Sequence, residues 1–435
     1  MTRMPIPDPG MPALVLRLDR NPFHHGTLGA VRSLGRAGVE VHAVVESARS
    51  PVARSRHLHR AHVRPPGELR PTDFVDLMLE VSERIGRRAV LIAMDDLGAV
   101  SVAAHAPRLA HRFVFPEQAA EATETLADKT ELVRLCAAAG IAHPDTVVPR
   151  SAVEAADAVR RLGLPLVAKW SRPWLLGPDT GLRSTCLVTS PGQARRLFER
   201  SGQAGSRLLL QRHLPDGPHS DWFFHGYFSR GSVCLFGGTG RKELAWPPRA
   251  GLTAKGRWQR NDDVEAAALR LVASCGYQGI LDLDFRWDPA GGAYRLLDVN
   301  PRPGAQFRLF TDEGGFDVVR SLYLDLTGQA VPRAEGRPGR VFVAENYALL
   351  SAVAGVRSRT PGRAGEAHRG LETAWFARDD VLPFLAMTAA WLHRGLVKGA
   401  NRVRPLLRRR AAPAAAVVPE ARSEGARTAS CTTWQ

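Results

Sequence analysis

Two consecutive segments of alternating apolar and polar residues constrain this chain most. Residues 279–286 read GILDLDFR, and residues 295–304 read RLLDVNPRPG. Alternation with a period of two predicts two strands, and the turn-forming DPAGG run between them predicts a hairpin. Asp284 on the first strand would therefore share a face with Asp298 and Asn300 on the second, and Asp282 lies on the same face of its strand as Asp284.

Hard oxygen ligands in small number suit Mg²⁺, which keeps several waters and binds substrate phosphates at its remaining positions. Arg302 lies just beyond the second strand, where a planar guanidinium would neutralise a phosphoryl group. The alternative is a surface hairpin whose acids face solvent. The D-x-N-P-R ending favours a magnesium site for a nucleotide.

Composition limits the class of protein. A chain of 435 residues with 44% apolar content can bury two or three cores, so several domains are expected. No run of 18 apolar residues and no signal-peptide pattern occurs, which predicts a cytoplasmic protein. The five cysteines are scattered without C-x-x-C spacing, so neither disulfides nor structural zinc is expected.

The net charge of +16 raises the alternative of nucleic-acid binding. The arginines are dispersed apart from Arg408–Arg410, and no aromatic and basic interleaving is present, so we expect no nucleic-acid partner. Only five of the 59 basic residues are lysines, which draws attention to Lys129, Lys169 and Lys242 as positions that need a compact ammonium group.

The N-terminal part predicts a small doubly wound α/β domain over residues 1–117. Strands are expected at 13–18, 39–45, 89–94 and 112–115, with helices at 26–37 and 96–105. No G-x-G-x-x-G run occurs, which argues against dinucleotide binding.

Residues 118–330 predict an α+β domain with two lobes, 118–205 and 206–330. The smaller lobe would contain helices at 129–139 and 151–162 and a strand at 164–169; the larger would contain the strand 208–211, a long hairpin over 221–242, a helix at 263–275 and the acidic hairpin. A helical extension is expected over 331–410, and the Ala- and Pro-rich residues 411–435 are expected to be disordered.

The order of these features resembles the ATP-grasp superfamily of carboxylate-amine ligases. The resemblance covers residues 13–310 and rests on Asp128-Lys129 at the head of a helix, on PLVAK at 165–169, on LLLQ at 208–211 and on LDVNPR at 297–302. The segments 26–35 and 222–227 are similar to the branch that includes D-aspartate ligase. The fold implied is an N-terminal doubly wound α/β domain followed by a two-lobed ATP-grasp domain with antiparallel sheets.

The resemblance also implies roles for individual residues. Lys129 and Lys169 would contact the ATP phosphates, and Asp221 would contact the ribose. The adenine would lie against the hinge formed by Gln211, Arg212, His213 and Leu214. Two Mg²⁺ ions, for which Mn²⁺ can substitute, would be held by Asp284, Asp298 and Asn300. Arg302 would steady the reacting oxygens, and Arg241 and Lys242 would hold the substrate carboxylate or acyl phosphate.

The activity implied is amide or peptide bond formation. A substrate carboxylate would attack ATP to give an acyl phosphate and ADP, and an amine would then expel phosphate. Partners would be a small-molecule carboxylate and amine, an amino acid or peptide in particular, and a homodimer is compatible. The sequence departs from the family at Arg212 and Asp298, where glutamate is common, and in a loop, 171–184, without a glycine run.

Two other functions stay open. A nucleotide-binding regulatory protein without turnover would keep the fold and lose a metal ligand or Arg302. A membrane-surface accessory protein would use the apolar face of residues 380–396 and the basic residues 402–410. We expect no membrane contact, because such a helix is more often a packing element.

Overall fold

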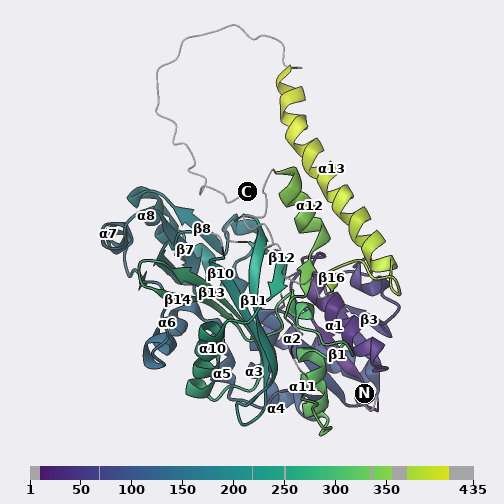
Figure 1. Cartoon of the computed structure of the whole chain (residues 1–435). Coiled ribbons are helices and arrows are strands. Elements are labelled where there is room, and N and C mark those ends of the chain that lie inside the picture. The colour runs from purple at the N-terminus through teal and green to yellow at the C-terminus, as the bar shows by residue number, and fades with distance from the viewer. Residues whose placement is uncertain are drawn as a thin grey trace.

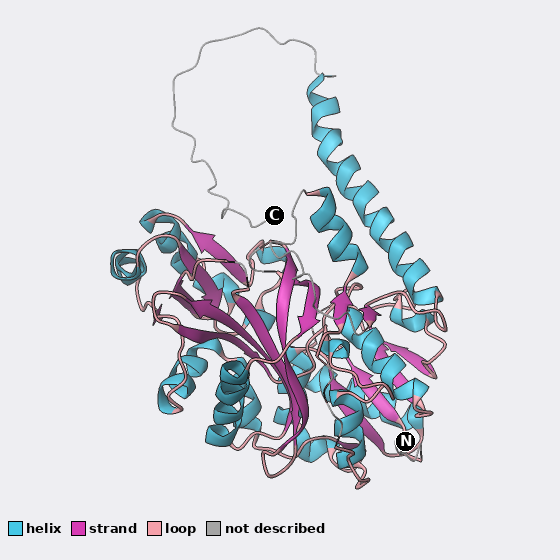
Figure 2. Ribbon diagram, viewed as in Figure 1, coloured by secondary structure: helices cyan, strands magenta, loops and turns pink. Residues whose placement is uncertain are grey.

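The computed structural model describes residues 10–67, 69–217, 219–248, 251–333, 336, 338–354 and 370–410. It contains a five-stranded, a four-stranded and a seven-stranded sheet, and helices cover them (Figures 1 and 2). This mixed architecture confirms the expected parallel N-terminal sheet, followed along the chain by antiparallel sheets.

The N-terminal sheet is parallel, with the strand order β3-β2-β1-β4-β5. Its strands are β1 (Ala13–Leu16), β2 (Val41–Val45), β3 (Arg60–Val63), β4 (Ala89–Ala93) and β5 (Phe113–Val114), and its helices are α1 (His25–Arg36), α2 (Pro71–Ile85), α3 (Asp96–Ala104) and α4 (Ala106–Leu109).

Helices on both faces make the N-terminal domain doubly wound, as predicted. Leu28 of α1 packs in the same core as Val15, whereas Phe74 of α2 packs in the core that contains Leu14. Neighbouring residues of β1 point to opposite faces, so each face of the sheet receives its own helix. The elements β3 and α2 were not part of the sequence prediction; β3 is a half-polar edge strand with a weak signal.

The four-stranded sheet is antiparallel, in the order β6-β9-β7-β8. It consists of β6 (Thr146–Val147), β7 (Leu166–Trp170), β8 (Thr185–Val188) and β9 (Leu208–Arg212), with α5 (Ala120–Ala127), α6 (Lys129–Ala138), α7 (Ala152–Leu162), α8 (Pro191–Glu199) and α9 (Ser201–Ala204) along this part of the chain. Because β9 pairs with β6 and β7, a boundary between lobes at residue 206 separates β9 from its own sheet. The domain boundaries stay predictions.

The seven-stranded sheet has the order β14-β13-β10-β11-β12-β15-β16. Its strands are β10 (Asp221–Phe228), β11 (Cys234–Trp246), β12 (Leu252–Trp258), β13 (Gly279–Asp288), β14 (Ala293–Asn300), β15 (Val341–Val343) and β16 (Leu371–Thr373), and the remaining helices are α10 (Asp262–Cys275), α11 (Val318–Leu326), α12 (Glu345–Val353) and α13 (Leu382–Arg410). One face packs on α10 through Phe224, Leu283 and Leu271.

The C-terminal part is not only helical, because β15 and β16 extend the large sheet. Trp375 and Met387 then join one core with Val15 of the N-terminal sheet and Phe223 of the large sheet. This shared core holds the N-terminal domain against the large sheet. The expectation of disorder for 411–435 lies outside the described residues, and none of the described helices has the length and apolar character needed to span a membrane.

Candidate active site

The acidic hairpin is formed by β13 and β14. Asp284 lies opposite Asp298, and Asp282 lies opposite Asn300. Directly paired residues of an antiparallel sheet share a face, so the structure brings these four side chains together as the alternation predicts. A bulge follows the Asp284 pair, where the register shifts by one residue.

Two lysines from other elements converge on Asp298. Lys169, on β7, donates from Nζ to Asp298 Oδ2 at 3.1 Å and to the Leu297 carbonyl oxygen at 2.8 Å. Lys129 donates to Asp298 Oδ1. Lys129 is the first residue of α6, whose N-cap Asp128 accepts a hydrogen bond from Thr130 N at 2.8 Å. Both lobes therefore meet at one carboxylate.

The charges of this group shift one another. Burial works against ionised Asp298, but the two ammonium groups outweigh it and hold the pKa of Asp298 far below its ordinary value. Burial, together with the neighbouring Lys129, lowers the pKa of Lys169. Burial also opposes the charge of Lys129, yet Asp298 raises its pKa overall. A phosphate group that enters this site would replace Asp298 as the ionic partner of Lys129 and Lys169.

Lys242 serves Asp284 in the same way. Its Nζ donates to Asp284 Oδ1 at 3.2 Å. Burial, and after it the charges of Asp282 and Asp298, nonetheless raise the pKa of Asp284. A divalent cation would relieve this accumulation of negative charge.

The donor set fits a hard cation. Asp284 and Asp298 supply carboxylate oxygens from facing positions. Asn300 Nδ2 donates to Asp282 Oδ2 at 3.3 Å, which leaves the amide oxygen of Asn300 as the atom able to face a cation.

Arg302 is held between two carboxylates. Its Nε donates to Asp96 Oδ1 at 3.2 Å, and its Nη1 donates to Asp282 Oδ2 at 3.1 Å. The other oxygen of Asp282 lies 2.6 Å from Nε2 of the fully buried His225. The preceding Asp95 is a helix cap, whose Oδ1 accepts from Gly98 N at 2.6 Å.

Sequence reasoning did not assign Asp282 and His225 to this group. Asp282 had a usable signal, because it shares the face of Asp284 two residues away. His225 had none, since only the pairing of β10 with β13 brings it opposite Asp282. His24 and His25 line the cavity in front of Arg302.

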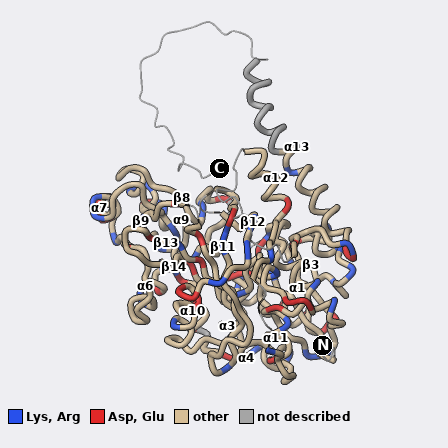
Figure 3. The backbone as a smooth tube through the Cα atoms, in the orientation of Figure 1, with Lys and Arg blue, Asp and Glu red and all other residues tan. Residues whose placement is uncertain are grey.

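Two cavities meet at the acidic hairpin. The smaller cavity, of about 120 Å³, is lined by β7, β9, β10 and the hinge; the larger cavity, of about 550 Å³, lies between the large sheet and the N-terminal domain. Thr185, Lys242, Asp284 and Asp298 line both. Positions of both charge signs lie close together on the strands of the large sheet (Figure 3). A group that passes from one cavity to the other must cross these charges.

Most of the expected hinge residues line the smaller cavity, namely Gln211, Arg212 and Leu214, whereas His213 is not among its lining residues. Arg212, which stands where glutamate is common, donates from Nη2 to Asp288 Oδ2 at 2.7 Å. Asp221 also lines the cavity and accepts from Arg286 Nε at 2.5 Å. Arg212 and Asp221 are therefore both ion-paired beside the cavity.

Arg241 does not reach the site. Neighbouring residues on a strand point to opposite faces, so Lys242 faces Asp284 while Arg241 lies on the far face opposite Trp222. There Arg241 Nη2 donates to Glu243 Oε1 at 3.2 Å. Pairing Arg241 with Lys242 as substrate contacts was wrong for Arg241.

No protein-family model and no curated protein matches this sequence. Solved structures do match. N5-carboxyaminoimidazole synthetase from Staphylococcus aureus, complexed with ADP, has a TM-score of 0.55 at 14% identity, with 74% of this chain and 79% of that chain covered. Biotin carboxylase from Campylobacter jejuni, in a β,γ-ATP complex, has a TM-score of 0.57 at 13% identity over 75% of this chain and 74% of that chain.

L-amino acid ligase from Bacillus licheniformis is also similar, with a TM-score of 0.56 at 14% identity over 76% of this chain and 78% of that chain. At these identities the similarity is one of fold. It confirms the ATP-grasp fold expected from the sequence. The branch of D-aspartate ligase stays a prediction.

Proposed function

We propose that this protein is an ATP-dependent ligase that activates a carboxylate as an acyl phosphate and joins it to an amine. The observation that carries the proposal is the convergence of Lys129, Lys169 and Lys242 on Asp298 and Asp284 where two cavities meet. Three mostly buried lysines, each paired with Asp298 or Asp284, form a site for a charged group that moves between the cavities.

ATP would bind in the smaller cavity. Lys169, which lines this cavity, and Lys129, which lines the larger cavity beside it, would contact its phosphates, and the hinge around Gln211 would contact the adenine. Asp284, Asp298 and the amide oxygen of Asn300 would hold Mg²⁺, and the family resemblance implies two ions. The Mg²⁺ would neutralise phosphate charge and polarise the transferred group. The solved structures of similar fold that are complexes with ADP and ATP support a nucleotide as the ligand.

The carboxylate would bind in the larger cavity, in front of Arg302. One of its oxygens attacks the γ-phosphorus, the bond to the β-phosphate oxygen breaks, and ADP leaves. Arg302, aligned by Asp96 and Asp282, and Lys242 on the opposite side would stabilise the charge that develops on the phosphoryl oxygens.

An amine then attacks the acyl carbon, and the carbon-oxygen bond to phosphate breaks. The surplus proton of the amine leaves with the phosphate. The similarity to L-amino acid ligase, and the resemblance to D-aspartate ligase, favour an amino acid or peptide among the substrates.

The test is release of ADP by the purified protein with Mg²⁺ and ATP across a panel of amino acids and dipeptides, with mass spectrometry of the products. Turnover should require a carboxylate and an amine together and should yield the amide. Bound ATP with no turnover across the panel would instead support a nucleotide-binding regulatory protein. Phosphate release that does not depend on an acid would contradict the acyl phosphate step.

A matched pair of variants makes the assay specific. Asp284→Asn removes one charge from the site and should abolish Mg²⁺-dependent turnover. Asp157→Asn removes one charge from the exposed face of α7, where Asp157 pairs with Arg160, and should leave turnover unchanged.

A further inference from the structure

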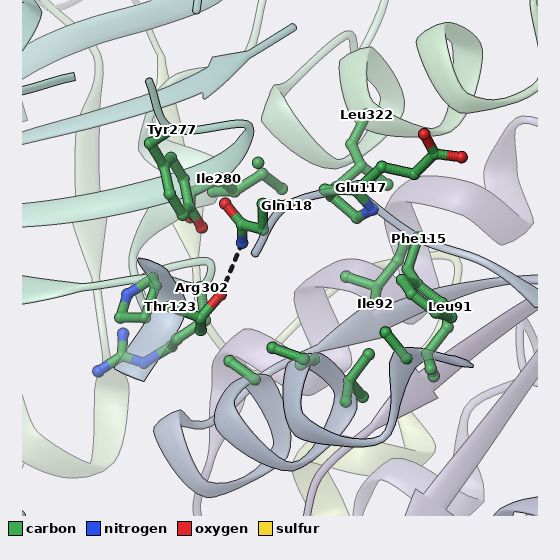
Figure 4. Close-up of a pocket in the computed structure, with 18 of the residues that line it drawn as sticks. Leu91, Ile92, Phe115, Glu117, Gln118, Thr123, Tyr277, Ile280, Arg302 and Leu322 are labelled. Carbon is green, nitrogen blue, oxygen red and sulfur yellow. Dashed lines mark hydrogen bonds between the residues drawn. The ribbon is translucent and has the colours of Figure 1, made fainter. Parts of the chain in front are cut away.

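A third cavity lies behind Arg302, between the N-terminal domain and the large sheet (Figure 4). Its volume is about 340 Å³. We call it the interdomain cavity. Leu91 and Ile92 of β4, Val102 of α3, Ile280 of β13 and Leu322 of α11 contribute apolar side chains to its lining. The segment 115–118, which connects the two domains, forms a further part of the wall.

The interdomain cavity is separate from the two cavities of the candidate active site. Among the described lining residues, Arg302 is shared with the larger cavity and none is shared with the smaller. In Figure 4 the guanidinium of Arg302 points away from the interdomain cavity. Its Nε and Nη1 donate to Asp96 and Asp282. A molecule in the interdomain cavity would therefore contact the segment 301–303 on the side away from the Arg302 guanidinium.

One edge of the interdomain cavity is polar. Gln118 Nε2 donates to Thr123 Oγ1 at 2.7 Å, which Figure 4 shows as a dashed line. Gln118 Oε1 is buried and has no hydrogen-bond partner of normal geometry, although the amide of Gln118 lies close enough to the Tyr277 hydroxyl to lower the pKa of that phenol. The hydroxyl of Tyr277 lies nearby, but it donates its proton to the Ile280 carbonyl oxygen at 3.2 Å. A buried amide atom without a partner is costly, and a ligand group can satisfy it.

The charges around the interdomain cavity are already matched. Arg302 is neutralised by Asp96 and Asp282, and Glu117 pairs with Arg230 at 2.8 Å, where both side chains are mostly exposed. Burial raises the pKa of Tyr277, so its phenol stays neutral. A charged ligand would lose its hydration here without gaining a counter-ion.

We propose that the interdomain cavity binds a small neutral molecule with an apolar body of about two fused rings and one hydroxyl group. The volume lies in the range of small-molecule sites, which are mostly apolar with a few convergent polar groups. A hydroxyl is the group that fits Gln118, because it can donate to Oε1 or, with the amide turned over, accept from Nε2. The proposal rests on geometry and does not depend on the ligase activity.

The probe for the test is 2-naphthol, measured by equilibrium dialysis and calorimetry on the full chain. We expect saturable binding of one molecule per chain that excess MgADP does not displace. Naphthalene, without a hydroxyl, should bind at least tenfold more weakly, roughly the loss of one hydrogen bond. 2-Naphthoate, which is charged, should bind at least 100-fold more weakly.

Two variants locate the bound probe. Ala103→Trp, on the α3 wall, should fill the interdomain cavity and abolish binding, while Gln118→Met should reduce it about tenfold and leave naphthalene unaffected. Ala137→Trp, on the exposed face of α6, is the control for adding an indole ring and should bind like the wild type. Absence of saturable binding, displacement by MgADP, or equal binding by wild type, Ala103→Trp and Gln118→Met would each overturn the proposal.

Discussion

Asp298→Asn is the substitution that separates the two proposed roles of the acidic hairpin. In the structure one carboxylate neutralises both Lys129 and Lys169. The same carboxylate is proposed to bind Mg²⁺. Asparagine keeps the shape of the side chain and removes its charge. It should therefore weaken Mg²⁺ binding and, at the same time, leave Lys129 and Lys169 available to phosphate.

The magnitude follows from the geometry. Two unit charges 4 Å apart interact by about 4 kcal/mol at an effective dielectric constant of about 20. The Asp298 side chain is 27% exposed, so part of this energy is screened. We take about 2 to 3 kcal/mol, which corresponds to a loss of roughly 100-fold in Mg²⁺-dependent turnover. In the absence of metal the substitution should strengthen nucleotide binding instead of weakening it. The phosphate then no longer competes with the Asp298 carboxylate for the two ammonium groups.

The assay is calorimetric titration of ADP into wild type and Asp298→Asn, with Mg²⁺ and with EDTA. We expect the variant to bind MgADP more weakly and metal-free ADP more tightly than wild type. Circular dichroism and the melting temperature check that the fold survives. If the variant bound both forms of ADP as wild type does, or bound metal-free ADP more weakly, the arrangement of lysines, carboxylate and metal described above would be refuted.

Three further predictions concern charged residues of the candidate site and of the large sheet. Lys169→Ala should weaken ADP binding at least tenfold while Arg160→Ala on the exposed face of α7 leaves it unchanged, and equal affinities would contradict a phosphate contact at β7. Arg302→Lys cannot reach two carboxylates with a planar fork, so turnover should fall about 100-fold with ADP affinity unchanged, and wild-type turnover would remove Arg302 from the mechanism. Burial opposes the charge of Glu243, but hydrogen bonds from Arg257 and Lys255 outweigh it and lower the pKa of Glu243 to about 2, below its ordinary value of 4.5. Ionised Glu243 should therefore stabilise the fold by on the order of 3 kcal/mol above pH 4.5. This contribution should be lost as the pH falls through 2. Glu243→Gln should flatten this part of the curve of unfolding free energy against pH, and an unchanged curve would contradict the assignment.

Local patterns predicted much of the fold because they report local rules. The period-two alternation around Asp284 and Asp298 predicted both strands and their shared face, and the register confirms it. Helix signals were equally local, as at Asp128, which caps α6. Elements with weak alternation were missed, and β3 is the clearest case. Arg241 was misplaced because adjacency along a strand was read as adjacency in space, although neighbouring side chains diverge.

The sequence by itself determined which groups could hold a cation and phosphates, because carboxylates two residues apart on a strand share a face whatever surrounds them. Only the tertiary structure decided what meets them. Lys129 and Lys169 come from residues far along the chain and reach Asp298 because two lobes pack across the hairpin. His225 supports Asp282 only through the register of β10 with β13, and the interdomain cavity exists only because the N-terminal domain packs against the large sheet. Contacts between distant segments depend on packing of whole elements, and no local pattern records them.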